Sequence, residues 1–404
     1  MGLNAQPSGE RVHIGFFGLR NAGKSSVVNR VTGQTLSIVS DVKGTTTDPV
    51  QKAMELLPIG PVVIIDTPGI DDEGTLGEER VRRALRVLEK TDIAVLVTDS
   101  TRGLQPAEQE LIELFRKREI PFVIAHNKAD LTSVPAAMPE NEIYVSAADS
   151  NIRELKELIA RAVKPTEPEK RLVADLLAPN DTVVLVVPID SAAPKGRLIL
   201  PQQQTIRDIL EAGAISLVTR ETELTRTLES LREPPRLVIT DSQAFGIVDK
   251  LVPKNVQLTS FSILFARYKG NLRQAILGAA QLNSLQDGDT VLISEGCTHH
   301  RQCGDIGTEK LPNWIRRFTG KDVQFSFTVG NEFPEDVSKY ALVVHCGGCM
   351  LNEREMQYRL RHSAERNVPM TNYGIAIAHM HGILDRALAL FPDLHQAWSS
   401  TANG

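Results

Sequence analysis

With 404 residues, the chain is too long for one ordinary core, so its length predicts two or three domains. Hydrophobic residues make up 42% of it and charged residues 24%, as in a soluble α/β protein. A formal net charge of -5 leaves nucleic-acid binding without electrostatic support. No apolar run approaches the ~20 residues of a membrane span, and the N-terminus lacks a signal-peptide core. We therefore predict a cytoplasmic protein that binds neither membrane nor nucleic acid.

Strand-like apolar runs alternate with helical stretches from Val12 to about Lys164. The runs read HIGFFG, VVIID, IAVLVTD, FVIAHN and IYVSA, and helices are predicted over 78–90 and 107–117. This alternation is typical of βαβ units around a parallel sheet. The charged, proline-bearing stretch KPTEPEKRLVADLLAPND follows and predicts a linker.

Two further α/β segments are predicted after this linker. In the first, helices are expected to start near 202, 223 and 243, and strands to cover 183–188, 215–218 and 237–240. In the second, helices are expected within 261–282 and over 375–390, and strands over 290–294, 324–328 and 341–344. The predicted fold class is therefore three α/β domains, over residues 1–170, 171–258 and 259–404.

The stretch GLRNAGKS directly follows the first strand and opens a helix, as a phosphate-binding loop requires. Gly18 and Gly23 allow backbone turns that let successive N–H groups face phosphate oxygens. Lys24 would reach the β- and γ-phosphates, and Ser25 would bind Mg²⁺. An ordinary glycine turn before a helix is the alternative, which the full match of the motif disfavours.

Four further motifs then follow in chain order. GTTTD offers Thr46, or Thr45, as a ligand for magnesium and the γ-phosphate. DTPG ends a strand and places Asp66 near the metal and the Gly69 N–H near the γ-phosphate. NKAD ends another strand, and SA ends the strand after that one. NKAD by itself would be an ordinary surface turn, but five motifs in this order predict a nucleotide site.

The predicted base is guanine because of Asp130. Its carboxylate can accept hydrogen bonds from both the ring N–H and the exocyclic amine of guanine, which adenine does not offer. GTP, not ATP, is therefore the expected substrate. Asn127 is expected to brace the loops, and Lys128 to lay its stem along the base. Ser146 and Ala147 form the SA motif, in which the Ala147 N–H can bond the guanine oxygen.

These motifs resemble the G1 to G5 motifs of the TrmE-Era-like GTPases over about the first 165 residues. The resemblance implies a P-loop GTPase fold in which Ala22 and Ser26 also contact the nucleotide. Ile70 stands where other GTPases orient water with glutamine, so turnover should be slow, although simple packing also explains an apolar residue there. Asn21 matches the asparagine that binds K⁺ in cation-activated members; bracing of the loop is the alternative.

A second candidate site involves cysteines at two strand ends. Cys346 and Cys349 lie in YALVVHCGGCM, just after a predicted strand, while Cys297 and His299 follow another. Because the carboxyl ends of strands in an open α/β sheet face one crevice, the two segments are expected to meet. The helix predicted after Cys349 would point its positive end at the cysteines and favour thiolates.

Spacing alone leaves three interpretations of these cysteines. A thioredoxin-like redox pair would need only the C-x-x-C motif, without Cys297 or His299. A structural zinc site would use three cysteines and one histidine. An iron-sulfur cluster would take the same three thiolates and leave one iron to a weaker ligand. The spacing is equally compatible with zinc and with iron-sulfur.

The whole chain resembles the HydF family, the GTPase maturases of [FeFe]-hydrogenase. The features that carry the resemblance are the GTPase motifs, the small middle α/β segment, Cys-x-His, and His-Cys-x-x-Cys about 45 residues later. It implies a [4Fe-4S] cluster on Cys297, Cys346 and Cys349 with a labile fourth position. It also implies a homodimer formed through the middle domain. Two radical-SAM maturase enzymes would supply a diiron precursor for delivery to the hydrogenase apoprotein.

The fourth cluster ligand stays open at this stage. His345 and His299 belong to the motif, and Asp305 offers a hard oxygen nearby. Cys303 is interpreted as a bystander, because a fourth thiolate would close the position that an incoming precursor needs. The predicted function is a GTP-hydrolysing scaffold whose C-terminal domain is no catalyst. An RNA-modification or ribosome-assembly GTPase with structural zinc is the alternative, disfavoured by the lack of a basic appendage.

Overall fold

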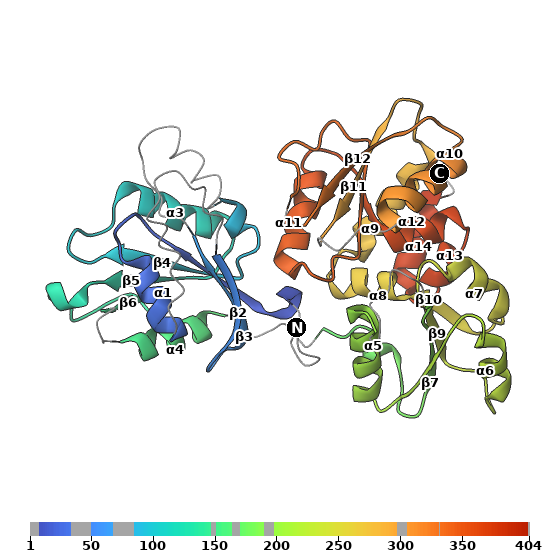
Figure 1. The fold of residues 1–404 in the computed structure, drawn as a ribbon, viewed down its shortest axis with the longest axis horizontal. Coiled ribbons are helices and arrows are strands. Elements are labelled where there is room, and N and C mark those ends of the chain that lie inside the picture. Colours follow the sequence, from blue (N-terminus) through green and yellow to red (C-terminus); the bar gives the residue numbers. More distant parts are fainter. Residues whose placement is uncertain are drawn as a thin grey trace. The chain divides into compact units, whose positions relative to one another are not determined.

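The computed structural model describes residues 8–33, 50–67, 85–146, 151–163, 170–189, 198–296, 305–330 and 332–402 (Figure 1). The chain divides into two compact units, Met1–Pro168 and Glu169–Gly404. Both are built on largely parallel sheets, which confirms the predicted α/β fold class. Every helix in the described residues is too short or too polar to cross a lipid bilayer.

A six-stranded sheet forms the centre of the N-terminal unit, in the order β2-β3-β1-β4-β5-β6. Only β2 runs antiparallel to its neighbour. The strands are β1 (Val12–Phe17), β2 (Val50–Leu56), β3 (Gly60–Asp66), β4 (Ile93–Asp99), β5 (Phe122–Asn127) and β6 (Glu142–Tyr144). The parallel strands all end at the same edge, where the sequence placed its nucleotide motifs.

Helices cover both faces of this sheet (Figure 1). They are α1 (Lys24–Thr32), α3 (Pro106–Lys117) and α4 (Ile152–Ala162), with short turns η1 (Ser8–Glu10) and η2 (Ala129–Leu131). Successive strand residues point to opposite faces, so Phe16 packs with α1 and α4, whereas Phe17 packs with α3. Most of the helix predicted over 78–90 lies outside the described residues.

The second unit contains two parallel four-stranded sheets, and the first of these has the order β10-β9-β7-β8. Its strands are β7 (Thr182–Val186), β8 (Ile215–Thr219), β9 (Leu237–Thr240) and β10 (Gln257–Ser260). The intervening helices are η3 (Ala174–Leu176), α5 (Leu200–Glu211), α6 (Leu224–Ser230) and α7 (Phe245–Leu251). The sequence predicted three of the four strands, and β10 was missed.

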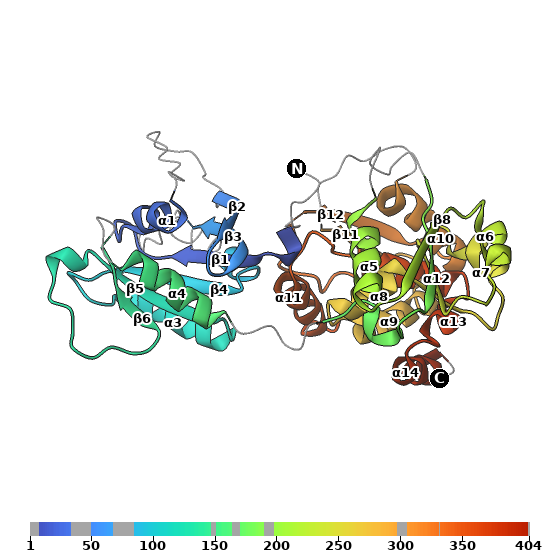
Figure 2. The ribbon, with the colours of Figure 1, turned by 90° about the horizontal axis from the view of Figure 1, so that it is seen from below.

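The second sheet has the order β12-β11-β13-β14. Its strands are β11 (Thr290–Glu295), β12 (Gln324–Val329), β13 (Leu342–His345) and β14 (Met370–Asn372). Its helices are α8 (Phe261–Tyr268), α9 (Leu272–Ala279), η4 (Ala280–Asn283), the π-helix η5 (Ile306–Lys310), α10 (Leu311–Thr319), α11 (Glu353–Ala364), α12 (Tyr373–Met380), α13 (Leu384–Leu388) and α14 (Pro392–Ala402). Figure 2 shows α11 on one side of β11, and α10 and α12 on the other.

One apolar core joins the first sheet to helices that flank the second sheet. It includes Val184 and Ile239 from the first sheet together with Ile263, Ile276 and Ile375 from helices α8, α9 and α12. The predicted boundary between 258 and 259 falls inside β10, and α8 starts directly after that strand. The exact domain boundaries therefore stay predictions, while the packing joins the middle and C-terminal segments.

The single helix predicted over 375–390 is wrong. Helix α12 ends at Met380 and α13 begins at Leu384, with Gly382 between them at a φ of +71°. Glycine adopts this left-handed conformation without steric cost, so the chain turns there and the helix stops. The stretch 261–282 is divided in the same way at Gly270, whose φ is +72°.

The approach of α9 to β14 predicts a stability effect at Gly278. A Cβ atom there would lie 2.2 Å from the carbonyl oxygen of Met370, which is backbone and has no rotamer to change. Gly278→Ala should therefore lower the free energy of unfolding by about 1–3 kcal/mol through overpacking. Denaturant unfolding followed by far-UV circular dichroism measures this. Gln274→Ala, at an exposed position of the same helix, is the control and should change little; equal stability of the two variants would contradict the packing.

Candidate functional site

The loop between β1 and α1 passes so close to other strand ends that two of its positions require glycine. A Cβ at Gly18, whose φ is +154°, would lie 2.3 Å from the carbonyl oxygen of Val97 in β4. A Cβ at Gly23, whose φ is +82°, would lie 2.1 Å from Nδ2 of Asn127 in β5. The predicted phosphate loop is thus seated over the carboxyl ends of β4 and β5, where helix α1 begins.

Three polar side chains meet at the start of α1. The Lys24 ammonium is buried and donates to Asp66, the last residue of β3. The Ser25 hydroxyl donates to the other oxygen of the same carboxylate, at 3.2 Å. Parallel pairing of β1 with β3 sets Asp66 opposite Phe16, just before the loop. The arrangement brings together an ammonium, a hydroxyl and a carboxylate, which is the set that a magnesium-bound triphosphate uses.

The remaining loop residues differ in exposure. Ala22 is fully buried, whereas Asn21 and Ser26 are exposed. Asn21 adopts a φ of +64°, a left-handed conformation that asparagine tolerates better than most residues. Its side chain is therefore accessible to an ion beside the loop.

Residues of the NKAD motif connect the phosphate loop to the SA motif. Nδ2 of Asn127 donates to the carbonyl oxygen of Ala22 at 2.9 Å and so ties β5 to the phosphate loop. The Ser146 hydroxyl donates to Oδ1 of Asp130 at 2.7 Å. Asp130 and Ser146 are 16 residues apart in the sequence, so this contact brings the NKAD and SA motifs side by side.

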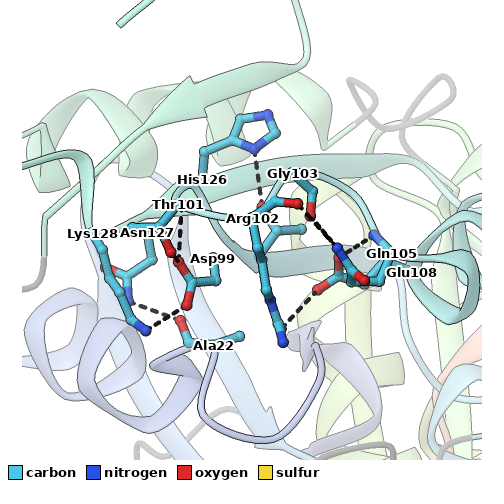
Figure 3. Close-up of polar contacts among 11 residues, drawn as sticks. Ala22, Asp99, Thr101, Arg102, Gly103, Gln105, Glu108, His126, Asn127 and Lys128 are labelled. Carbon is cyan, nitrogen blue, oxygen red and sulfur yellow. Dashed lines mark hydrogen bonds and ion pairs between the residues drawn. The ribbon is translucent and has the colours of Figure 1, made fainter. Parts of the chain in front are cut away.

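Asp99, at the end of β4, is a site residue that the sequence analysis missed (Figure 3). Its Oδ2 accepts a hydrogen bond from Nζ of Lys128 at 2.5 Å. Its Oδ1 accepts from the backbone N–H and the hydroxyl of Thr101, at 3.0 and 2.6 Å. Burial raises the pKa of Asp99, but the Lys128 and Thr101 hydrogen bonds together outweigh it and lower the pKa to about 2. Asp99 therefore contacts Lys128 as a carboxylate.

A buried polar layer lies next to this contact (Figure 3). Nδ1 of His126 contacts the Thr98 hydroxyl at 2.9 Å, and Nε2 contacts the Glu142 carboxylate at 2.8 Å. Glu108 accepts from the Gln105 N–H at 2.9 Å and caps α3, and its burial raises its pKa. These contacts fix the strand directly before Asn127.

Several predicted site residues lie outside the described residues. In the nucleotide site these are Thr45, Thr46, Gly69 and Ala147, together with Ile70. In the cysteine site they are Cys297, His299 and Cys303. Their roles stay predictions.

The second site begins with the parallel pairing of β11 and β13, in which Ser294 lies opposite His345. The Cys346 N–H donates to the Ser294 carbonyl oxygen at 2.8 Å. The sulfur of Cys346 accepts from the Gly296 N–H at 3.0 Å and from the Gly348 N–H at 3.4 Å. Because Cys297 is the next residue after Gly296, the chain leads directly from this contact into the other cysteine segment.

Cys349 lies partly buried in the turn that follows β13. Burial raises the pKa of its thiol, the nearby Cys346 adds to this, and Lys269 acts in the opposite sense. The buried Lys269 ammonium donates to the Leu351 carbonyl oxygen at 2.5 Å and anchors the turn. Gly348 has a φ of +62° and lets the chain reverse between the two cysteines.

His345 is fully buried and both of its ring nitrogens have partners. Nδ1 lies 2.7 Å from the carbonyl oxygen of Cys346, and Nε2 lies 2.9 Å from Nη1 of Arg359. Arg359 is 1% exposed and also donates to Glu355 at 2.7 Å and to the Gly330 carbonyl oxygen at 2.9 Å. Arg359 was not predicted from the sequence, because α11 has the composition of an ordinary charged helix.

Carboxylates also lie near the cysteines. Oδ2 of Asp305 accepts from the N–H and the hydroxyl of Thr308, both at 2.9 Å, and caps η5. The Tyr373 hydroxyl donates to the buried Glu295 at 3.2 Å. The pKa of Tyr373 is raised by burial first and then by the charges of Glu295, Cys346 and Asp305. Glu295, two residues before Cys297, was missed by the sequence analysis.

The donor set fits a group that thiolates bind. Among the described residues, no three His, Cys, Asp or Glu side chains form a ready metal-binding group. The described part supplies Cys346 and Cys349, and Gly296, which precedes Cys297 in the sequence, contacts the Cys346 sulfur. Thiolate ligands select zinc and iron-sulfur clusters over hard cations. N–H donors at a cysteine sulfur are the contacts that tune an iron-sulfur site.

Three protein-family models match the chain. The model described as "50S ribosome-binding GTPase" matches residues 13–128. The "Hydrogen maturase F dimerization domain" matches residues 172–270, and the "Hydrogen maturase F tetramerization domain" matches residues 273–390. The two maturase models together match more than half of the chain.

Several relatives in sequence match about a third of the chain. The chain is 36% identical over 155 residues to the tRNA modification GTPase MnmE of Legionella pneumophila (strain Paris), covering 37% of this chain and 34% of that one. It is 41% identical over 125 residues to the GTPase Der of Maridesulfovibrio salexigens, and the match covers 30% of this chain and 27% of that protein. The chain thus spans about a third of the length of the curated relatives it matches. A probable GTP-binding protein engB of known structure is 26% identical to this chain, with a TM-score of 0.30. The match covers 38% of this chain and 99% of that one.

The six-stranded sheet, the glycine-dependent loop and the matched models define the N-terminal unit as a P-loop GTPase domain. Residues 172–270 and 273–390 match the two maturase models. The chain belongs to the hydrogen maturase F family.

The Asp99–Lys128 contact predicts that Asp99→Asn weakens guanine-nucleotide binding by about 3- to 10-fold, the range expected for loss of one ordinary hydrogen bond. The stabilising contribution of Asp99 is complete above its unfolded pKa of about 4 and is lost only as the pH falls through about 2. The ratio of nucleotide affinities between the variant and the wild type should therefore be constant from pH 6 to 8. Titration with a fluorescent GDP analogue measures it.

Asp92→Asn is the matched control for this experiment. Asp92 lies just before β4, at the opposite end of that strand, and bonds the His13 N–H at 2.8 Å. Its substitution should leave nucleotide affinity unchanged. Wild-type affinity in Asp99→Asn would show that Lys128 needs no partner.

Proposed function

We propose that this chain is a GTP-hydrolysing scaffold for the maturation of [FeFe]-hydrogenase. It would bind a [4Fe-4S] cluster and carry a diiron precursor to the hydrogenase apoprotein. The observation that carries the proposal is the hydrogen bond from the Gly296 N–H to the Cys346 sulfur, in a chain of the hydrogen maturase F family. It supports a single thiolate site built from the two cysteine segments.

In the proposed nucleotide site, Lys24 binds the β- and γ-phosphates, and Ser25 and Thr46 are the magnesium ligands. Asp66 is positioned to hold a water of the magnesium shell, since it contacts both Lys24 and Ser25. The Gly69 N–H would face the γ-phosphate. The remaining loop residues, Gly18, Ala22, Gly23, Ser26 and Thr45, complete the phosphate cradle.

Asn21 is the proposed potassium ligand. Its exposed side chain on a loop of positive φ is available to an ion beside the phosphates. Such an ion supplies the positive charge that other GTPases obtain from an arginine finger. Hydrolysis would then be cation-activated.

In the proposed cluster site, the ligands are Cys297, Cys346 and Cys349. When bound, the cluster supplies an exchangeable iron position that a diiron precursor can occupy. The chain's own contribution is to fix the Cys346 sulfur between two N–H donors and to hold the turn through Lys269. His299 and Asp305 are candidates for the fourth position, and Cys303 is a bystander.

The proposed partners are two radical-SAM maturase enzymes and the hydrogenase apoprotein. The predicted middle domain, residues 171–258, would form the homodimer. The dimerization-domain model, which matches residues 172–270, supports this. We place the protein in the cytoplasm, without a nucleic-acid or membrane partner.

Base recognition is tested by Asp130→Asn. An amide at this position would donate a hydrogen bond where a guanine N–H needs an acceptor, and the 2-oxo group of xanthine would accept it. The variant should therefore prefer xanthosine triphosphate over GTP, measured by competition binding. Asp99→Asn is the matched control, since it should weaken both nucleotides without reversing the preference. An unchanged preference in Asp130→Asn would refute the assignment of Asp130.

The scaffold is tested by Cys346→Ser and Cys349→Ser under anaerobic reconstitution. Each variant should lose the [4Fe-4S] signal in EPR of the reduced protein and retain GTP turnover, because the cysteines lie in the second compact unit. Cys303→Ser is the control: it makes the same chemical change at the bystander position and should bind the [4Fe-4S] cluster as the wild type does. Tightly bound zinc without iron in the wild type would defeat the cluster proposal.

A further inference from the structure

Arg359 is a fully buried charged side chain next to the cysteine site. It is 1% exposed, and arginine is almost never buried to this degree unless it is paired. The pairing partner is Glu355, one turn earlier on α11, at 2.7 Å. The guanidinium also lies 5.2 Å from the centre of the Phe333 ring. Its charge is thus compensated within the helix, and its remaining N–H groups are aimed at other partners.

One of those partners fixes the tautomer of His345. A guanidinium has only donors, so the Nη1 of Arg359, 2.9 Å from Nε2 of His345, donates to that nitrogen. Nε2 therefore presents its lone pair to Arg359, and the ring proton is on Nδ1. Nδ1 lies 2.7 Å from the carbonyl oxygen of Cys346, and a carbonyl oxygen only accepts. The two contacts require the same tautomer.

This tautomer leaves His345 without a lone pair for a metal. A histidine binds a metal through an unprotonated ring nitrogen. In His345, one nitrogen carries the proton and the other accepts from Arg359, and the ring is fully buried. Coordination would require breaking a hydrogen bond to a buried guanidinium, which costs more than loss of a neutral hydrogen bond.

We propose that Arg359 is a positioning residue of the cysteine site and that His345 is not a cluster ligand. Arg359 holds His345 in the tautomer that donates to the Cys346 carbonyl oxygen. This contact fixes the backbone from which the Cys346 sulfur projects, and it leaves the exchangeable position of the cluster to another group. The inference rests on the proposed cluster site, but the tautomer itself is a property of the cluster-free protein.

The first experiment measures the tautomer without a cluster. Cluster-free full-length protein labelled with ¹⁵N-histidine gives ring nitrogen shifts that distinguish a protonated from an unprotonated nitrogen. His345→Gln assigns the signals of His345. A protonated Nδ1 with an unprotonated Nε2 is the expected result. A protonated Nε2, or fast exchange between the two forms, overturns the proposal.

The second experiment compares Arg359→Met, Arg359→Lys and Arg361→Met. Arg361→Met is the matched control, because Arg361 is exposed on the same helix. Arg359→Met should change the His345 ring shifts and lower iron bound per chain several-fold after reconstitution. Arg359→Lys, which keeps a charged donor, should restore loading in part, and Arg361→Met should match wild type. Wild-type loading and shifts in Arg359→Met overturn the proposal.

Removing Arg359 leaves Glu355 buried without its partner, which alone destabilises a protein. Where Arg359→Met fails to fold, the double variant with Glu355→Gln removes both charges and carries the same expectations. Pulsed EPR of the loaded wild type gives an independent measure: a nitrogen coupling that disappears in His345→Gln would make His345 a ligand and sink the inference. Failure of wild type to bind iron would instead refute the proposed function and leave the tautomer result standing.

Discussion

Parallel pairing of β11 with β13 is the constraint on which the cysteine site depends. Their register sets Ser294 opposite His345, so that both strands end at the same level. The Gly296 N–H then reaches the Cys346 sulfur although the two residues are 50 positions apart. A shift of one residue would turn His345 out of the core and move Cys346 away from Gly296. The site is therefore a property of sheet register more than of the loop sequences.

The N-terminal unit uses the same architecture for a different chemistry. There β1, β3, β4 and β5 end together and present the phosphate loop, Asp66, Asp99 and the NKAD motif. Both sites thus lie beyond the carboxyl ends of parallel strands, where backbone N–H groups and helix starts converge. The difference lies in the residues at those ends: carboxylates, an ammonium and hydroxyls in one case, thiols and backbone N–H groups in the other.

Site residues could be predicted from the sequence where a motif has fixed local spacing. They could not be predicted where their role depends on contacts between distant parts of the chain. The phosphate loop and the strand-end cysteines were found because their spacing is local. Strands β2, β10 and β14 were missed, since VQKAMEL is rich in polar residues and QLTS and MTN are too short to show alternation. Asp99 and Arg359 were missed because their partners are 29 and 14 residues away. Only the fold shows that Arg359 faces inward from a charged helix.

The apolar cores of the second unit meet at helix α12, and this has a mechanical consequence. The segment that matches a dimerization domain and the segment that holds the cysteines share packed side chains from β7 and β9 to α12. Close-packed interiors are stiff and transmit displacement instead of absorbing it. Helix α12 contributes Ile375 to this core and Ile377 to the core beneath β11 and β13. A displacement of β7 or β9 is thus transmitted through α12 to the strands whose ends carry Glu295 and His345.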